Sequence, residues 1–182
     1  MKKFLSILAT SLVLLIATSN ASATLITGTI EFTGNSSYTL NDDGDQVTSI
    51  DFTGIGSVDN TALVTYADGT FADEGVTAWS STAEFTDLST IDAIDELWSV
   101  LGFSFELTSI TENTVTDSTV TIAGSGYVSL EGYEDTLYTW TWTSQADGGT
   151  TFSATAVPSP AGAALLGLAL LGFGFARRNN NA

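Results

Sequence analysis

Apolar and polar residues alternate along several stretches in the middle of the chain. The alternation is clear at positions 25–32, 76–80, 103–107, 120–122 and 138–142. Because successive side chains of a strand point to opposite faces, this pattern predicts strands with one face in a core. Threonine, valine, isoleucine and aromatic residues dominate these stretches, as they do on pleated, half-buried surfaces.

Short clusters of Gly, Asp, Asn and Ser separate the predicted strands. Residues of these types are typical of tight turns. The clusters lie at positions 41–44, 68–69, 73–75, 124–126 and 147–149. Their spacing predicts an all-β fold, an antiparallel β-sandwich or barrel of roughly eight to ten short strands.

One stretch departs from the period of two. Within residues 90–101 the apolar residues recur at helical spacing, with Thr90 as a suitable N-cap and Gly102 as a suitable end. We expect at most a short helical turn here, with a strand resuming near Trp98.

Tyr138, Trp140 and Trp142 lie at alternate positions, so their side chains share one face of a predicted strand. We favour the interpretation that this face is core, as large aromatics in a β fold usually are. The alternative is an exposed platform on which sugar rings stack. Trp79 and Trp98 stand among other apolar residues, and we expect both in the core as well.

The two ends of the chain differ from its body. Residues 1–23 have two lysines, an apolar stretch and an Ala-Ser-Ala site at 21–23, the layout of a secretory signal peptide. We expect cleavage before Thr24, which leaves residues 24–156 as one secreted acidic β domain that is long enough to bury its own core.

The C-terminal residues 157–182 have three parts: the motif Val157-Pro158-Ser159-Pro160, an uncharged apolar segment at 161–176, and the pair Arg177-Arg178. As a helix the apolar segment would reach about 24 Å, at ~1.5 Å per residue, which is shorter than the ~30 Å hydrocarbon core of a bilayer. We expect a hydrophobic sorting helix that holds the chain in a membrane transiently, with the arginines on the cytoplasmic side.

This layout resembles the PEP-CTERM sorting signal, the mark of exosortase substrates in Gram-negative bacteria that make exopolysaccharide. Val157, Pro158, Pro160, the apolar segment and the arginine pair match it, and Ser159 stands where the family usually has Glu. The resemblance implies export across the inner membrane by the secretion machinery. It also implies transient anchoring, processing by an exosortase-type enzyme, and a final location at the cell surface or outside the cell. An ordinary single-span tail anchor is the alternative.

The body of the chain also resembles a group of PEP-CTERM proteins. The stretches that carry this resemblance are 50–54, 97–100, 103–109, 139–143 and 151–154. They imply a secreted β domain with no known enzymatic activity, and they point to no site.

Charge is divided sharply along the chain. All four basic residues lie in the two targeting ends and all 21 acidic residues lie between them, so the secreted domain carries −21 without Lys, Arg, His or Cys. This charge excludes nucleic acid as a partner. The missing residue types exclude a Ser-His-Asp triad, a Schiff base, His-ligated zinc and thiol chemistry. We therefore expect no enzymatic activity and no cofactor.

Two arrangements of carboxylates need separate consideration. Glu84 and Glu106 stand within apolar runs, where a pair would suit glycoside hydrolysis, but the outer face of a strand is the favoured interpretation. Asn41, Asp43 and Asp45 place oxygen atoms at alternate positions, like a fragment of a calcium loop. We favour a hairpin turn there, with divalent cations bound only non-specifically.

Two functions follow from the sequence. The first is a non-enzymatic structural or adhesive protein of the cell surface or exopolysaccharide matrix, processed through its C-terminal signal. The alternative is a carbohydrate-binding module, or less readily a weak glycoside hydrolase, that uses the face of Tyr138, Trp140 and Trp142. Burial of that face would favour the first function, and its exposure would favour the alternative.

Overall fold

The computed structural model of the protein describes residues 24–55, 58–145 and 151–158, with only the backbone at 151–154 and 158. The predicted signal peptide and the apolar segment 161–176 lie outside these residues. The elements, in chain order, are β1 (Thr24–Leu25), β2 (Ile30–Asn35), β3 (Ser37–Leu40), β4 (Val47–Asp51), β5 (Thr61–Ala67), α2 (Thr70–Asp73), β6 (Thr82–Phe85), β7 (Ile94–Val100), β8 (Phe103–Val115), β9 (Thr119–Ser129), β10 (Tyr133–Glu134), β11 (Thr136–Gln145) and β12 (Thr151–Pro158).

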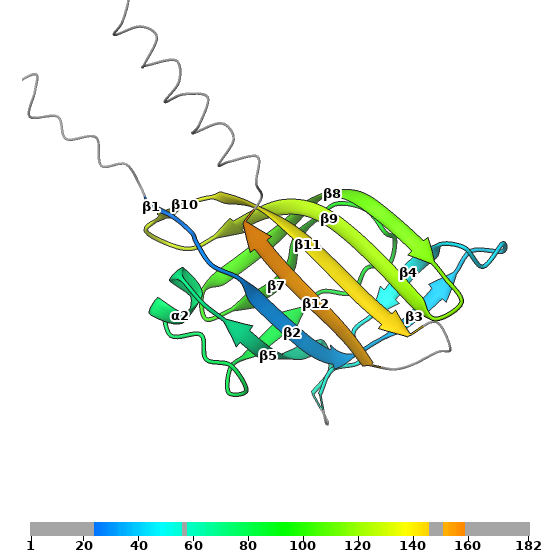
Figure 1. Ribbon diagram of the computed structural model, residues 1–182, viewed down its shortest axis with the longest axis horizontal. Coiled ribbons are helices and arrows are strands. Elements are labelled where there is room, and N and C mark those ends of the chain that lie inside the picture. The colour runs from blue at the N-terminus through cyan, green and yellow to red at the C-terminus, as the bar shows by residue number, and fades with distance from the viewer. Residues whose placement is uncertain (1–23, 56–57, 146–150, 159–182) are drawn as a thin grey trace, which may run out of the picture.

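Eight antiparallel strands form a closed barrel in the order β2-β5-β6-β7-β8-β9-β11-β12, and β12 pairs back with β2 (Figure 1). Neighbours in the barrel also follow one another along the chain, as in an up-and-down barrel. The predicted all-β fold is therefore confirmed, and the barrel is the correct one of the two architectures. Two short sheets lie outside the barrel, the parallel pair β1-β10 and the hairpin β3-β4.

Aromatic side chains from the alternate positions of the strands fill the barrel. Trp98 stacks on Phe105 with ring centroids 5.5 Å apart, and Phe32 lies 5.1 Å from Trp98 on another side. Phe32 and Phe85 meet edge to face at 5.3 Å. An eight-stranded barrel is just wide enough for side chains to fill, and rings in these geometries attract one another beyond their burial.

Two inward-facing glycines of β9 make room for this core. Gly124 is the cross-strand partner of Trp140, and Gly126 is the partner of Tyr138. A Cβ atom at Gly126 would lie 1.8 Å from the carbonyl oxygen of Glu106. The predicted turn at 124–126 is therefore wrong, because these glycines lie inside β9 and serve as the small partners of large residues.

One end of the barrel, called here the tail end, holds β1, β10, α2 and the last residue of β12 (Figure 1). Phe71 of α2 is fully buried there, with its ring centroid 4.6 Å from that of Phe103 and 6.0 Å from that of Tyr138. The Thr70 hydroxyl accepts a hydrogen bond from the Thr27 N–H at 2.9 Å, which attaches α2 to the chain before β2. The sequence did not predict α2, since four residues are too few to show a helical period.

The opposite end, called here the hairpin end, is covered by β3-β4 and the segment after it. The Asn113 side chain bonds both the N–H and the carbonyl oxygen of Val47 at 2.9 Å. Ile50 and Leu88 exchange backbone hydrogen bonds of 2.8 and 2.9 Å. Phe52 then packs on Phe85 with centroids 4.8 Å apart. Both ends of the barrel are therefore occupied by side chains from the connecting segments.

Three further predicted elements differ in the structure. The strand predicted at 25–32 is interrupted, because β1 ends at Leu25 and β2 begins only at Ile30. Residues 76–80 form turns instead of a strand, and β6 begins only at Thr82. Residues 90–101 contain no helix, and β7 already starts at Ile94. The helical spacing of apolar residues has another cause there, since a register shift between Ile94 and Trp98 accompanies two consecutive buried residues, Leu97 and Trp98.

Candidate functional site

The aromatic face of β11 is the core of the barrel. Tyr138, Trp140 and Trp142 are each 0% exposed, which confirms the favoured interpretation. The Tyr138 hydroxyl donates to the Gly28 carbonyl oxygen at 3.1 Å, and burial, with a smaller contribution from Asp68, raises the pKa of this phenol. Because no edge of these three rings reaches the surface, they offer no platform for sugars.

The turn at 41–45 is closed by its own side chains. The Asn41 side-chain oxygen accepts from the N–H groups of Asp45 and Gln46 at 3.1 and 3.2 Å, and its amide donates to the Asp45 carboxylate at 2.7 Å. Asp43 is exposed beside them. Nowhere in the part of the chain that the structure describes do three or more Asp, Glu, His or Cys residues gather to hold a metal ion. These contacts support the hairpin interpretation over a calcium loop.

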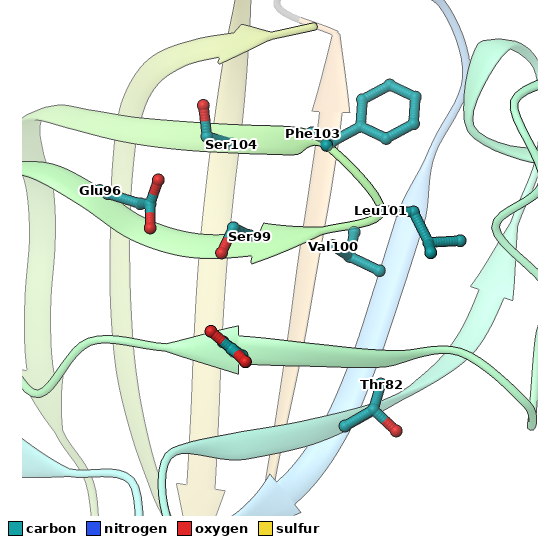
Figure 2. A pocket seen from close by; sticks show the side chains of 9 residues that line it. Thr82, Glu96, Ser99, Val100, Leu101, Phe103 and Ser104 are labelled. Atoms are coloured by element: carbon teal, nitrogen blue, oxygen red, sulfur yellow. The ribbon is translucent and has the colours of Figure 1, made fainter.

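A groove of about 430 Å³ runs over the outer face of β6, β7 and β8 (Figure 2). Glu96 and Ser99 of β7 and Ser104 of β8 line it, and Figure 2 shows their oxygen atoms along its floor. A second hollow of about 310 Å³ shares Glu84 and Glu96 with the first and continues to residues 58–61.

The polar groups of this groove are carboxylates, which accept hydrogen bonds and repel anions, and the hydroxyls of Thr82, Ser99 and Ser104, which both donate and accept hydrogen bonds. Glu84 and Glu96 are exposed and therefore solvated, as is Glu106 on β8, which lies outside the groove. No basic residue exists between positions 24 and 156 to pair with them. The exposure of Glu84 and Glu106 agrees with the outer-face interpretation. The groove is a surface hollow with a polar lining, and we assign no reaction to it.

Trp79 is the surface feature that the sequence failed to predict. It was expected in the core, but it is 69% exposed, and its backbone has φ 62°. The Trp79 N–H donates to the Val64 carbonyl oxygen at 2.7 Å, and the Thr77 N–H donates to the Ser81 hydroxyl at 2.9 Å. A bulky residue with positive φ is uncommon and unfavourable, so the loop holds this indole in solvent at a cost in conformational energy.

Two tyrosines near the tail end, the exposed Tyr66 and the half-buried Tyr133, bond acidic residues. The Tyr66 hydroxyl donates to Asp68 at 2.9 Å, and the Tyr133 hydroxyl donates to Glu74 at 2.6 Å. Each hydrogen bond raises the pKa of its phenol, because losing the proton would place two negative charges together. These pairs tie side chains of the tail end to one another and leave the phenols protonated.

The predicted sorting motif begins within β12, the last strand of the barrel wall. Val157 and Pro158 are the last residues of β12, and they pair with Thr139 and Tyr138 of β11. Ser159, Pro160, Arg177 and Arg178 lie outside the described residues. Among the residues with described structure, no helix is long and apolar enough to cross a membrane.

Comparison with known proteins found no matching family model, no matching curated protein and no matching solved structure.

Proposed function

We propose that this chain is an exported, non-enzymatic structural or adhesive protein of the cell surface or exopolysaccharide matrix, processed through its C-terminal signal. One observation carries the proposal. The described domain follows the predicted signal peptide directly, since β1 begins at Thr24, and β12 ends at Pro158, within the predicted sorting motif and before the apolar segment at 161–176. Both segments therefore join the domain at its tail end (Figure 1). A self-contained domain bounded in this way suits export followed by removal of both ends.

The interior and the surface of the barrel support a role without catalysis. The interior is filled by aromatic side chains, with Phe71 at the tail end and Phe52 at the hairpin end. Residues 24–156 include no Lys, Arg, His or Cys. A filled barrel whose surface has acidic but no basic side chains can serve as a durable extracellular module. It attracts divalent cations only through its overall negative charge.

The intact mass of the protein recovered from the cell envelope and the medium tests the routing. We expect a mature form that begins at Thr24 and has lost Arg177 and Arg178. A variant with Arg177→Gln and Arg178→Gln is the matched control, because it alters only the basic end of the signal and should accumulate as precursor. A secreted wild-type form that retains both arginines would contradict the proposal.

Trp79 favours a second candidate function, binding of an uncharged glycan. Its indole is exposed at 69% and held in an unfavourable backbone conformation, so the side chain is displayed at the expense of stability. An exposed indole offers a flat apolar surface to the face of a sugar ring. The acidic domain would repel a polyanion, which leaves uncharged polysaccharide as the ligand class.

Affinity electrophoresis in gels that contain a neutral polysaccharide tests this second function. We expect retardation of the wild type, loss of retardation in Trp79→Ala, and full retardation in Leu101→Ala. Leu101 is a matched control, because it is also apolar, 61% exposed and in a positive-φ conformation at the tail end. Equal mobility of the wild type and Trp79→Ala in every polysaccharide gel would exclude glycan binding through Trp79.

A further inference from the structure

Three neighbouring strands of the barrel contain no acidic residue. They are β9, β11 and β12, which lie side by side in the barrel wall (Figure 1). All 21 Asp and Glu residues of the chain lie outside these strands. The outer face of β9, β11 and β12, called here the uncharged wall, therefore differs from the acidic surface around it.

One cross-strand row shows how the uncharged wall is bounded. Ala123 of β9, Thr141 of β11 and Thr155 of β12 lie opposite one another in its middle. Continued to the next strand on each side, the same row reaches Glu112 of β8 and Glu31 of β2. Small uncharged side chains therefore occupy the centre, and carboxylates lie at both edges. Interfaces between proteins have this arrangement, with charged residues depleted from the core and a polar rim around it.

The uncharged wall also presents apolar side chains to solvent. Tyr127 of β9 is 40% exposed and lies opposite the half-buried Leu137 of β11. Tyrosine is one of the residues enriched at protein interfaces. The Ser125 hydroxyl bonds the Ser109 hydroxyl at 2.8 Å, so covering it would not leave it without a partner. The composition of the wall thus suits contact with another protein surface.

Charge selects the partner for this wall. The domain has no basic residue between positions 24 and 156, so its acidic faces repel any acidic molecule, including a second copy of the domain. A basic partner would be attracted to those acidic faces and not to a wall without carboxylates. On the uncharged wall, by contrast, two copies can meet without burying a carboxylate that has no basic group to pair with.

We propose that two copies of this chain associate through their uncharged walls, with a two-fold axis near Thr141. Such a pair is isologous, because the same face of each copy lies against the other. The small residues of the central row allow the two sheets to approach to the ~10 Å at which sheets pack face to face. Three strands of this length cover roughly 500 Å² on each copy. That area is near the lower limit of specific interfaces, so we expect a dimer that dissociates on dilution.

This association leaves the opposite side of the barrel free. In the ring of eight strands, β6 is the fourth from β11 in either direction. The groove of Figure 2 and the turn with Trp79, which leads into β6, therefore lie away from the proposed interface. Recognition of other molecules and association of two copies thus use different sides of the barrel. The association is also independent of how the two ends of the chain are processed.

A single cysteine at the centre of the uncharged wall tests the pairing. The chain has no cysteine, so Thr141→Cys gives each copy one thiol beside the proposed axis. We expect mild oxidation of this variant, purified from its native cells, to convert most of it into a disulfide-linked dimer. Thr82→Cys is the matched control, because Thr82 is also an exposed strand threonine but belongs to β6 on the opposite side. This control should remain mostly monomeric.

An added charge and added salt should shift the same equilibrium in opposite directions. Thr141→Asp is expected to raise the dimer dissociation constant at least about tenfold, because the axis brings two new carboxylates together. Thr82→Asp adds the same charge on the opposite side and should change the constant much less. For the wild type, raising the salt concentration from about 0.01 M to about 0.15 M shortens the Debye length from ~30 Å to ~8 Å and should lower the constant. Sedimentation equilibrium measures all three.

Two results would overturn the inference. One is equal cross-linking of Thr141→Cys and Thr82→Cys. The other is a wild type that sediments as a monomer at both salt concentrations, whether its wall is then covered by a glycan, by the chain's own C-terminal segment or by solvent alone. Melting curves verify that each variant folds. If Thr141→Asp does not fold, the cross-linking and the salt dependence of the wild type still decide.

Discussion

The wall of the barrel differs greatly between its β9-β11 side and its β6-β7 side. β11 pairs with β9 over its full length, from Thr136 to Gln145. β6 pairs with β7 only through Glu84 with Ser99 and Phe85 with Trp98. The long pairing lies over the Tyr138, Trp140 and Trp142 core, whereas the short pairing lies at the groove of Figure 2.

The two sides of the barrel also differ in how they place a tryptophan, although Trp140 and Trp79 have similar neighbours in the sequence. Trp140 and Trp79 both lie among threonines, serines and apolar residues, yet one is fully buried and the other is mostly exposed. Trp140 lies in a long strand opposite a glycine, so the barrel has room for it. Trp79 lies in the turn before the shortest barrel strand, where no facing strand covers it. Stability is therefore expected to depend on the β9-β11 side, and surface recognition on the other.

The largest difference between the two regions is expected when the tryptophan of each is replaced by alanine. Trp140→Ala is expected to lower the free energy of unfolding by about 3–5 kcal/mol, because it empties the volume of an indole in the core. Trp79→Ala is expected to change it by no more than about 0.5 kcal/mol, because little packing is lost at the surface. Urea denaturation of both variants measures the difference. Similar losses for the two would disprove the division between the regions.

An added methyl group tests the close packing behind β9. Gly126→Ala is expected to lower the free energy of unfolding by about 1–3 kcal/mol, since the new Cβ would collide with the Glu106 carbonyl oxygen and the Phe105 ring. Ser125→Ala is the control, because Ser125 faces outward on the same strand. Chemical denaturation of both variants and the wild type measures the change in the free energy of unfolding. An unchanged Gly126→Ala midpoint would mean that β8 and β9 are looser than the structure indicates.

Alkaline pH should weaken the β9-β11 side through Tyr138. Burial raises the pKa of its phenol above the ordinary value of 10.0, so the unfolded chain loses this proton first as the pH rises. The stabilisation is complete below pH 10 and is lost as the pH rises from there through the raised pKa of Tyr138. Melting temperatures at pH 9 and 11 should fall less in Tyr138→Phe than in the wild type. Tyr66 lies at the surface, so Tyr66→Phe should retain most of the wild-type fall in melting temperature between pH 9 and 11. An equal fall in all three proteins would refute the role of Tyr138 in this pH dependence.

The smallest expected effect concerns the turn between β7 and β8. Leu101 and Gly102 have φ 48° and 89°, the pattern of a two-residue type I′ turn, in which Asn-Gly is preferred. Leu101→Asn should therefore raise the free energy of unfolding by about 0.5–1 kcal/mol, since the exposed leucine side chain packs on little. Gly102→Ala is the opposing control and should destabilise the turn. A loss of stability in Leu101→Asn would show that the leucine has contacts that outweigh its backbone strain.

The strands with strict alternation were predictable from the sequence. Positions 103–107, 120–122 and 138–142 all fall inside barrel strands, and the aromatic face of β11 is core as predicted. Prediction was less successful where the backbone departs from ideal pairing. The register shift in β7 produced a helix-like spacing, and the paired glycines of β9 had the composition of a turn. In both cases the local pattern is ambiguous, and only the facing strand resolves it.

The candidate sites divide in the same way. The sequence singled out the 41–45 turn and the start of the sorting motif, and the structure describes both as parts of strands or turns that bond within the domain. It gave no indication of the groove between Glu84 and Glu96, because those residues come from two strands whose alignment depends on the whole barrel. Trp79 was missed because exposure is a property of the surrounding fold and not of neighbouring residues.

By itself the sequence determined that the domain is all-β and has a large aromatic core. It also determined that no ion pair between side chains can form within residues 24–156, because every charged residue there is acidic. Stability must therefore come from apolar burial and hydrogen bonds. Only the tertiary structure decided that the strands close into a barrel instead of a sandwich, since both have the same alternation. It also decided that β12 extends to Val157 and Pro158, because Thr139 and Tyr138 of β11 lie opposite them after the pairing with β2 has stopped at Ala156.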